Sequence, residues 1–161
     1  MANSGPIRVG TSAFTAAGWE GTFYPAGMKP ANYLTYFATQ FDAVEVDSAF
    51  HRTPAVSRVK GWYAKTPPGF LFAAKAPQVI THEKALRDCN EDLSDFLKTM
   101  GCLGEKLGSL LFQFEYFNKK VFVGVNDFLA RLVPFLKKLP EGCRFAVETR
   151  NKNRLVPQGP S

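Results

Sequence analysis

Five polar side chains lie at the ends of short apolar runs, although polar side chains are unfavourable in the buried interior of a strand. They are Glu45, Lys75, Gln113, Glu148 and Arg150. Burying an unpaired charge is costly, so such residues need a partner or a task. A carboxylate can act as a general acid or base, and a cation can bind or protonate an anion. We therefore expect acid-base chemistry on a small polar or anionic molecule, with Glu45, Lys75 and Glu148 as the catalytic residues.

Two pairs of these charges have the spacing of one strand face. Glu45 and Asp47 are two residues apart, as are Glu148 and Arg150, and residues at this spacing point the same way. Glu45 can be a general base whose pKa its neighbour raises, or it can simply pair with Lys75 across adjacent strands. Arg150 can bind a carboxylate or phosphate in bidentate fashion, or form an internal salt bridge with Glu148. Lys75 fits three roles: a cation for the substrate, a proton donor, or a Schiff-base amine.

The predicted substrate-binding residues also lie beside strand ends. They are Thr11, Ser12, Asp47, His51, Gln113 and Arg150. His51 suits acid-base chemistry near neutral pH, although a lone loop histidine more often serves as a hydrogen-bonding residue. His82 is a weaker candidate for the same region.

Nothing in the residue spacing indicates a metal or a cofactor. The three cysteines lack CxxC spacing, and the chain has only two histidines, so a zinc site or a disulfide framework has no support. A carboxylate set such as Glu45, Asp47 and Glu148 would favour Mg²⁺ or Mn²⁺, but no motif accompanies it. We expect neither a metal nor a cofactor.

The elements that position these residues alternate between strand and helix. Short apolar runs predict strands at residues 7–10, 43–48, 70–74, 109–112 and 144–147,. Helical spacing of apolar residues predicts helices at 31–40, 55–66, 90–103 and 125–139, the last kinked by Pro134,. Helices that connect successive strands are typical of a parallel sheet.

Both a doubly wound sheet and a closed barrel fit this alternation. The glycine-rich loop of a dinucleotide-binding fold is missing after residues 7–10, which favours the barrel. A complete (β/α) barrel of the TIM type needs about 250 residues and eight units. The 161 residues of this chain would then form an α/β TIM-type barrel truncated after about the fifth strand. We assign residues 1–153 to this partial barrel and 154–161 to a tail, either a native loop or the remnant of an engineered protease linker.

The composition excludes several classes of protein. No window approaches the roughly 18 apolar residues of a membrane span, and the N-terminus lacks the apolar stretch of a secretory signal,. A cytoplasmic protein without a membrane partner is expected. The net charge of +6 favours anionic partners, but the basic residues are scattered, which suits an ordinary solvated surface better than a nucleic-acid interface.

Taken in order, the strand ends resemble one known family. The segments are 7–12 (IRVGTS), 19–25 (WEGTFYP), 44–52 (VEVDSAFHR), 72–77 (FAAKAP), 110–114 (LLFQF) and 145–151 (FAVETRN). The chain is identified as a member of the YecE-like proteins, also called domain of unknown function 72. The resemblance implies a TIM barrel that lacks its later strands here, and it implies no known activity. Three positions depart from the family: Asp47 replaces a usual Asn, His51 a common Tyr and Arg154 a common Trp.

Three functional interpretations stay open. The first is an enzyme derived from such a barrel and acting on a small polar or anionic ligand. The second is a barrel that binds or processes nucleic acid, which the positive charge allows. The third is a catalytically inactive fragment that self-associates, because a partial barrel exposes strand edges and apolar surface. Self-association is the expected physical state of the chain.

Overall fold

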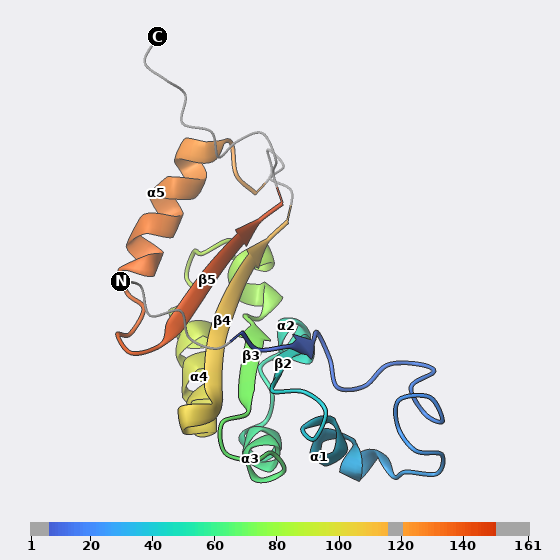
Figure 1. Ribbon diagram of the computed structural model, residues 1–161. Coiled ribbons are helices and arrows are strands. Elements are labelled where there is room, and N and C mark those ends of the chain that lie inside the picture. Colours follow the sequence, from blue (N-terminus) through green and yellow to red (C-terminus); the bar gives the residue numbers. More distant parts are fainter. Residues whose placement is uncertain (1–6, 116–120, 151–161) are drawn as a thin grey trace.

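A computed structural model of the chain describes residues 7–115 and 121–150 (Figure 1). Its core is one parallel sheet in which the strands lie in chain order, β1-β2-β3-β4-β5. The strands are β1 (Gly10–Thr11), β2 (Ala43–Val46), β3 (Leu71–Lys75), β4 (Leu107–Phe114) and β5 (Arg144–Thr149). The predicted alternation and parallel pairing are confirmed. The predicted tail at 154–161, including Arg154, lies outside the described residues.

The helices connect successive strands, as crossovers in a parallel sheet must. The α-helices are α1 (Tyr33–Phe37), α2 (Ser48–His51), α3 (Val56–Ala64), α4 (Asn90–Met100) and α5 (Val125–Leu136). Two 3₁₀ segments, η1 (Pro30–Asn32) and η3 (Gly101–Lys106), and one π-helix, η2 (Val79–Glu83), complete the set. No helix in the described ranges combines the length and apolar character needed to cross a membrane.

The predicted ends of several helices need correction. The helix predicted at 31–40 begins as the 3₁₀ turn η1 and continues in α-helical form only through Tyr33–Phe37. Threonine and aromatic residues are poor helix formers, which accounts for the short regular part. The α-helix predicted at 90–103 ends at Met100, where the chain tightens into η3. Helix α5 runs through Pro134 and ends at Leu136.

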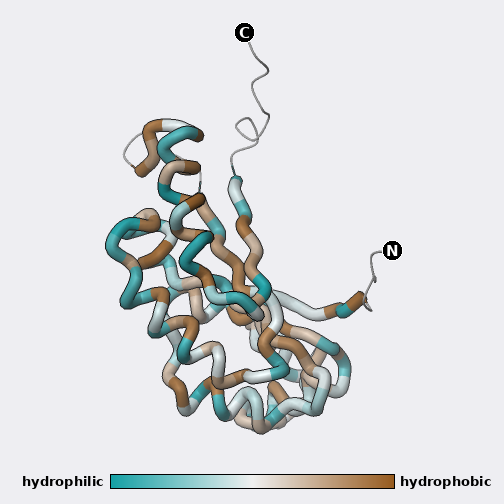
Figure 2. The backbone as a smooth tube through the Cα atoms, turned by 90° about the vertical axis from the view of Figure 1, so that its left-hand side faces the viewer, coloured by the Kyte–Doolittle hydropathy of each residue, from teal (hydrophilic) through white to brown (hydrophobic). Residues whose placement is uncertain are grey.

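The sheet has one face covered by helices. Trp62 of α3 stacks on Phe72 of β3 at a centroid distance of 6.1 Å. Phe135 of α5 meets Phe112 of β4 edge-on at 5.0 Å. The strand register places Phe72 and Phe112 on the same face, so α3 and α5 pack on the same side of the sheet. Figure 2 shows that the strands are largely apolar while the helices carry hydrophilic residues among apolar ones.

The opposite face carries the polar strand residues. Glu45 is aligned with Ala73, Lys75 with Leu111, and Gln113 with Glu148. Paired residues on neighbouring strands point to the same side, and residues two apart do too. These side chains are half-buried on β2, β3 and β4 and exposed on β5. We call this surface the open face.

The first strand differs most from its prediction. Strand β1 is Gly10–Thr11 rather than residues 7–10, and Ile7 and Val9 are 92% and 60% exposed. Gly10 is required where β1 meets β2, because a Cβ there would lie 2.0 Å from the carbonyl oxygen of Ala43,. The apolar run therefore precedes the paired residues instead of forming them.

Aromatic rings fill the space around α1. The rings of Tyr24 and Tyr33 stack at 4.0 Å, and Phe23 packs against Tyr24 at 4.8 Å. The buried hydroxyl of Tyr24 donates a hydrogen bond to the carbonyl of Phe14. Burial and the neighbouring Tyr33 raise the pKa of Tyr24 to about 12. The loop after β1 is thereby fixed against α1.

A buried lysine joins α3 to the segment before β4. Lys106 is 4% exposed, and its Nζ donates hydrogen bonds to the carbonyls of Tyr63 at 2.7 Å and Thr66 at 2.6 Å. The ammonium also lies 4.2 Å from the centroid of the Tyr63 ring. These acceptors belong to the C-terminal end of α3, where the helix dipole favours a cation. Lys106 thus satisfies carbonyl groups that the helix itself cannot.

Candidate functional site at the strand ends

One cluster of charges lies where β2 and β3 end. The Nζ of Lys75 is 2.7 Å from Oδ1 of Asp47 and 3.4 Å from Oε1 of Glu45. Lys75 is the last residue of β3, and its side chain is only 19% exposed. Asp47 lies beyond β2, at the N-cap of α2, so the expectation that it shares a strand with Glu45 is wrong. Its carboxylate reaches Lys75 from the turn that follows the strand.

The electrostatics of this cluster restrict the role of Lys75. Contact with Asp47, and secondarily with Glu45, raises the pKa of Lys75 despite partial burial. A Schiff base requires a neutral amine, so this arrangement disfavours that role and favours a cation or proton donor. Oδ1 of Asp47 is shielded from solvent and makes no hydrogen bond in the described residues. The contact between Asp47 and Lys75 is therefore an ion pair whose angles do not meet those of a hydrogen bond.

The pKa of Glu45 is also raised, and burial is the main cause. Lys75 acts in the opposite direction and lowers this pKa, while the neighbouring carboxylate of Asp47 adds to the increase. A carboxylate with a raised pKa is a stronger base than an exposed one once it is ionised. The cluster thus holds a cation beside a candidate general base.

A second cluster lies where β4 and β5 end. Nε2 of Gln113 donates to Oε1 of Glu148 at 2.7 Å, and a guanidinium nitrogen of Arg150 donates to Oε1 of Gln113 at 3.3 Å. Nε of Arg150 is 3.8 Å from Oε1 of Glu148. About half of the Glu148 and Arg150 side chains is exposed, at 45% and 51%. Gln113 is the centre of this cluster, which leaves the arginine open to solvent and to an anion.

Both clusters lie at the carboxyl end of the open face. Lys75 is aligned with Leu111, and Gln113 is two residues further along β4, roughly 7 Å at the rise of a strand. The carboxyl ends of parallel strands are where sites form in folds of this class. A small molecule at this end of the sheet would meet Lys75 on one side and Arg150 on the other.

Three residues predicted to bind substrate stand apart from these clusters. The hydroxyl of Thr11 donates to the carbonyl of Ala13, and Thr11 is aligned with Val44, on the helix-covered face. Ser12 is exposed, and the ring of His51 meets that of Phe50 edge-on at 5.7 Å. Over residues 7–115 and 121–150, none of the three is hydrogen-bonded to either cluster. Their place in a binding site stays a prediction.

The described residues offer little to a metal ion. No group of three His, Cys, Asp or Glu side chains in them has the arrangement that a metal would need. Glu45 and Asp47 come together, but both carboxylates are paired with the ammonium of Lys75. A divalent cation would have to displace the ammonium first.

Sequence comparison shows the family to which the chain is related. The family described as "Protein of unknown function DUF72" matches residues 8–158. The chain belongs to this family. The UPF0759 protein YecE of Escherichia coli strain K12 is 30% identical over 118 residues, which are 73% of this chain and 41% of that protein.

Solved structures of DUF72 family proteins are similar in fold to this chain. One from Thermotoga maritima is 30% identical with a TM-score of 0.70, covering 89% of this chain and 55% of that one. One from Enterococcus faecalis is 26% identical with a TM-score of 0.67, covering 94% of this chain and 54% of that one. The chain thus spans about half the length of these DUF72 relatives.

Two features of this site in the DUF72 chain were not predicted from the sequence. Asp47, rather than Glu45, is the nearer partner of Lys75, because the chain turns into α2 immediately after β2. Gln113, predicted only as a substrate-binding residue, also contacts both Glu148 and Arg150. The only sequence signal for the latter is the continued alternation of β4 through Phe114, which puts Gln113 on the open face.

Replacing Glu45 by Gln in this DUF72 chain is expected to reduce the loss of stability between acid and neutral pH. Because its folded pKa is raised, the folded state binds the Glu45 proton more tightly than the unfolded chain does. The stability from that proton is fully present below the unfolded pKa and is lost as pH rises through the raised one. Urea denaturation at pH 4 and pH 7 should show a smaller loss in E45Q than in the wild type.

Glu141 provides the matched control for this change, since it is exposed in the turn before β5. E141Q should keep the pH dependence of the wild type. An E45Q profile parallel to that of the wild type would contradict the assignment of a destabilising charge to Glu45.

Proposed function

We propose that the carboxyl end of the open face is the active site of an enzyme that applies acid-base chemistry to a small polar or anionic molecule. The observation that carries this proposal is the position of Lys75, whose Nζ is 2.7 Å from Asp47 and 3.4 Å from Glu45. Partly burying a cation and two carboxylates costs desolvation free energy. Such clusters of charge are common in active sites.

The arrangement supports a separate role for each charged group of the first cluster. Glu45 removes a proton from the substrate, because burial has raised its pKa,. Lys75, kept protonated by Asp47, stabilises the negative charge that then develops or returns a proton to it. Asp47 is a positioning residue that holds the ammonium in place.

The second cluster supports the binding of the substrate's anionic end. Arg150 is half exposed and is held by Gln113 and Glu148. A guanidinium can bind a carboxylate or phosphate through two parallel hydrogen bonds. Glu148 faces the same space and is the second candidate acid or base.

We also infer that the sheet is part of a TIM-type barrel. Two findings support this: the parallel strands follow one another in chain order, and α3 and α5 pack on one and the same face. A doubly wound sheet would place helices on both faces and reverse its strand order. In a closed barrel the open face would become the interior, and its polar carboxyl end the active-site mouth.

A titration with small anions tests the active-site proposal. Malonate and glycerol 3-phosphate represent carboxylates and phosphate esters, and ¹H–¹⁵N spectra of the chain report where each binds. Binding should shift the amide signals of residues 46–48, 75–77 and 148–150, and K75M should abolish these shifts. K84M is the control, because Lys84 pairs with Asp92 at 2.6 Å outside the site. Unchanged binding by K75M, or no shift at these amides, would overturn the proposal.

A second candidate concerns association of the chain with another copy. Strand β5 lies at the edge of the sheet, and no described strand pairs with its outer side. Val147 of β5 and Val133 of α5 are 39% and 47% exposed. An unprotected edge beside exposed apolar side chains favours pairing with another strand.

Sedimentation equilibrium tests this association. The wild type should show a concentration-dependent dimer, and V147K should shift it towards monomer. V56K, at an exposed valine of α3, should leave the dimer intact. A wild type that stays monomeric at millimolar concentration would rule out this second candidate.

A further inference from the structure

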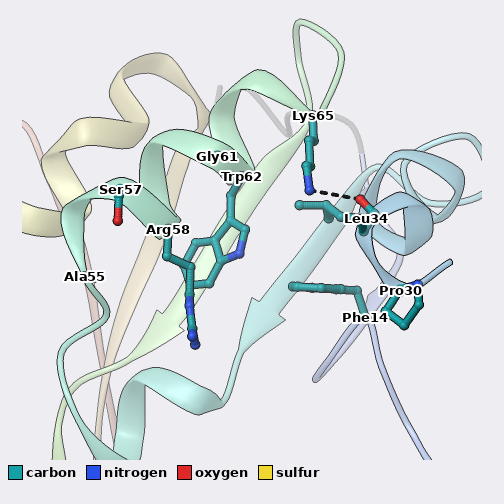
Figure 3. Close-up of a pocket in the computed structure, with 10 residues that line it drawn as sticks. Phe14, Pro30, Leu34, Ala55, Ser57, Arg58, Gly61, Trp62 and Lys65 are labelled. Atoms are coloured by element: carbon teal, nitrogen blue, oxygen red, sulfur yellow. Dashed lines mark hydrogen bonds between the residues drawn. The ribbon is translucent and has the colours of Figure 1, made fainter.

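A groove lies on the helix-covered side of the sheet, away from both charged clusters (Figure 3). One wall is a single face of α3 and its flanking residues, and the other is formed by Phe14 with the start of the α1 region. Its volume is about 440 Å³, which is the size of a small-molecule site. The lining residues are Phe14, Pro30, Ala31, Leu34, Ala55, Ser57, Arg58, Gly61, Trp62 and Lys65.

The first indication that the groove binds a ligand is Gly61. It lies inside helix α3, where glycine is a poor helix former compared with alanine,. No steric reason requires it, since an added Cβ would meet no atom within 4 Å. Because Gly61 lines the groove, any larger side chain there would take up its empty space. A helix that accepts this loss of stability keeps the groove open.

Aromatic rings face each other across the groove. Phe14 meets Trp62 edge-on at a centroid distance of 6.5 Å, and Figure 3 shows the two rings pointing towards one another from opposite walls. Trp62 is itself fixed from behind by stacking on Phe72. Rigid aromatic surfaces of this kind suit a flat apolar ligand.

The charges along the groove are all positive. Arg58 and Lys65 line it, and no acidic residue does. Nζ of Lys65 donates to the carbonyl of Ala31 at 2.9 Å and so ties the two walls together. The guanidinium of Arg58 is exposed and has no hydrogen-bond or ion-pair partner among the described side chains. An anionic group would complement it.

We propose that this groove binds a small monoanion with a flat apolar body, of the aryl carboxylate class. The ring system lies over Gly61 against Phe14 and Trp62, and the carboxylate pairs with Arg58 in bidentate fashion. The groove is on the opposite side of the sheet from Lys75, so this site is independent of the proposed active site.

Titration with 2-naphthoate, followed by ¹H–¹⁵N spectra, tests the proposal. The amide of Gly61 and the indole N–H of Trp62 should shift with millimolar 2-naphthoate, and the uncharged 2-naphthalenemethanol should bind more weakly. R58Q should weaken 2-naphthoate binding by about tenfold or more, a loss typical of a charge-assisted hydrogen-bonded pair. K60Q, which removes a cation from α3 outside the groove, should bind as the wild type does.

Variants at Gly61 separate folding from binding. G61A should raise the thermal midpoint, because alanine is the better helix former, and still weaken 2-naphthoate binding. G61L should abolish the binding while the chain remains folded. K75M should have no effect on it, which distinguishes this site from the strand-end site. Wild-type affinity in R58Q and G61L, or no shift of Gly61 and Trp62 with 2-naphthoate, would overturn the proposal.

Discussion

Replacing Lys106 by Met is expected to lower the free energy of unfolding by about 2–4 kcal/mol, since two carbonyls lose their donor in a buried place. The ammonium hydrogen-bonds to Tyr63 and Thr66 at the end of α3 and lies over the Tyr63 ring. Methionine fills a similar volume, so the change removes the hydrogen bonds and the favourable charge at the helix end without leaving a large cavity. Urea denaturation at pH 7 measures the loss.

The control for this change is K98M, which removes an exposed ammonium from α4. Surface substitutions of this kind change stability by roughly 0.5 kcal/mol or less. If K106M and K98M were equally stable, the hydrogen bonds of Lys106 would contribute nothing beyond those that the same groups make with water in the unfolded chain. Amide exchange should localise the effect of K106M to the last turn of α3.

Replacing Lys75 by Met should lower the free energy of unfolding at pH 7 by about 1–2 kcal/mol, between the values for exposed and buried ion pairs. Without the ammonium, Glu45 and Asp47 are left as neighbouring carboxylates. The pKa of Glu45 then rises further, because Lys75 is the cation that opposes its increase. A raised carboxyl pKa gives stability that is present at low pH and lost as pH rises, so the deficit of K75M should disappear towards pH 4.

Denaturation of K75M across this pH range is the measurement, and K84M is the comparison. Lys84 pairs with the single carboxylate of Asp92 on the surface, so its removal should have little effect at any pH. A loss of stability in K75M that is the same at pH 4 and pH 7 would mean that Lys75 stabilises the fold through packing of its aliphatic chain. It would also mean that repulsion between the carboxylates of Glu45 and Asp47 does not destabilise the fold.

Strands β2 to β5 could be predicted because each is a short apolar run, and β2, β3 and β4 are buried on one face. Strand β1 could not, because an equally apolar run, Ile7 and Val9, stays exposed while Gly10 makes the contact with β2. Hydrophobicity identifies segments that can be buried, but the strand pairing here is decided by how closely two backbones approach. The same limit applies to α1, whose aromatic residues pack well but form little regular helix.

The membership of the polar clusters followed from strand ends, and two of their contacts, Glu45 with Lys75 and Glu148 with Arg150, were among the predicted alternatives. The contacts of Asp47 and Gln113 were not predicted. Pairing of Lys75 with Asp47 depends on the turn into α2, and no residue spacing encodes that turn. The groove could not be predicted, because its two walls come from separate parts of the chain. Gly61 inside a helical stretch was the one indication of it in the sequence. Nor did the sequence indicate the connection after η2, where Ala85, Leu86 and Asp88 all have positive φ.

Each polar cluster joins two strands that are neighbours in both the sheet and the chain. Gln113 and Glu148 are 35 residues apart, and Gln113 and Arg150 are 37 apart, so each contact closes over a single strand–helix–strand unit. Glu45 and Lys75 are related in the same way, through β2 and β3. During synthesis from the N-terminus, the first cluster can therefore assemble on the ribosome before β5 has been translated, and the second can be added to it as a separate step.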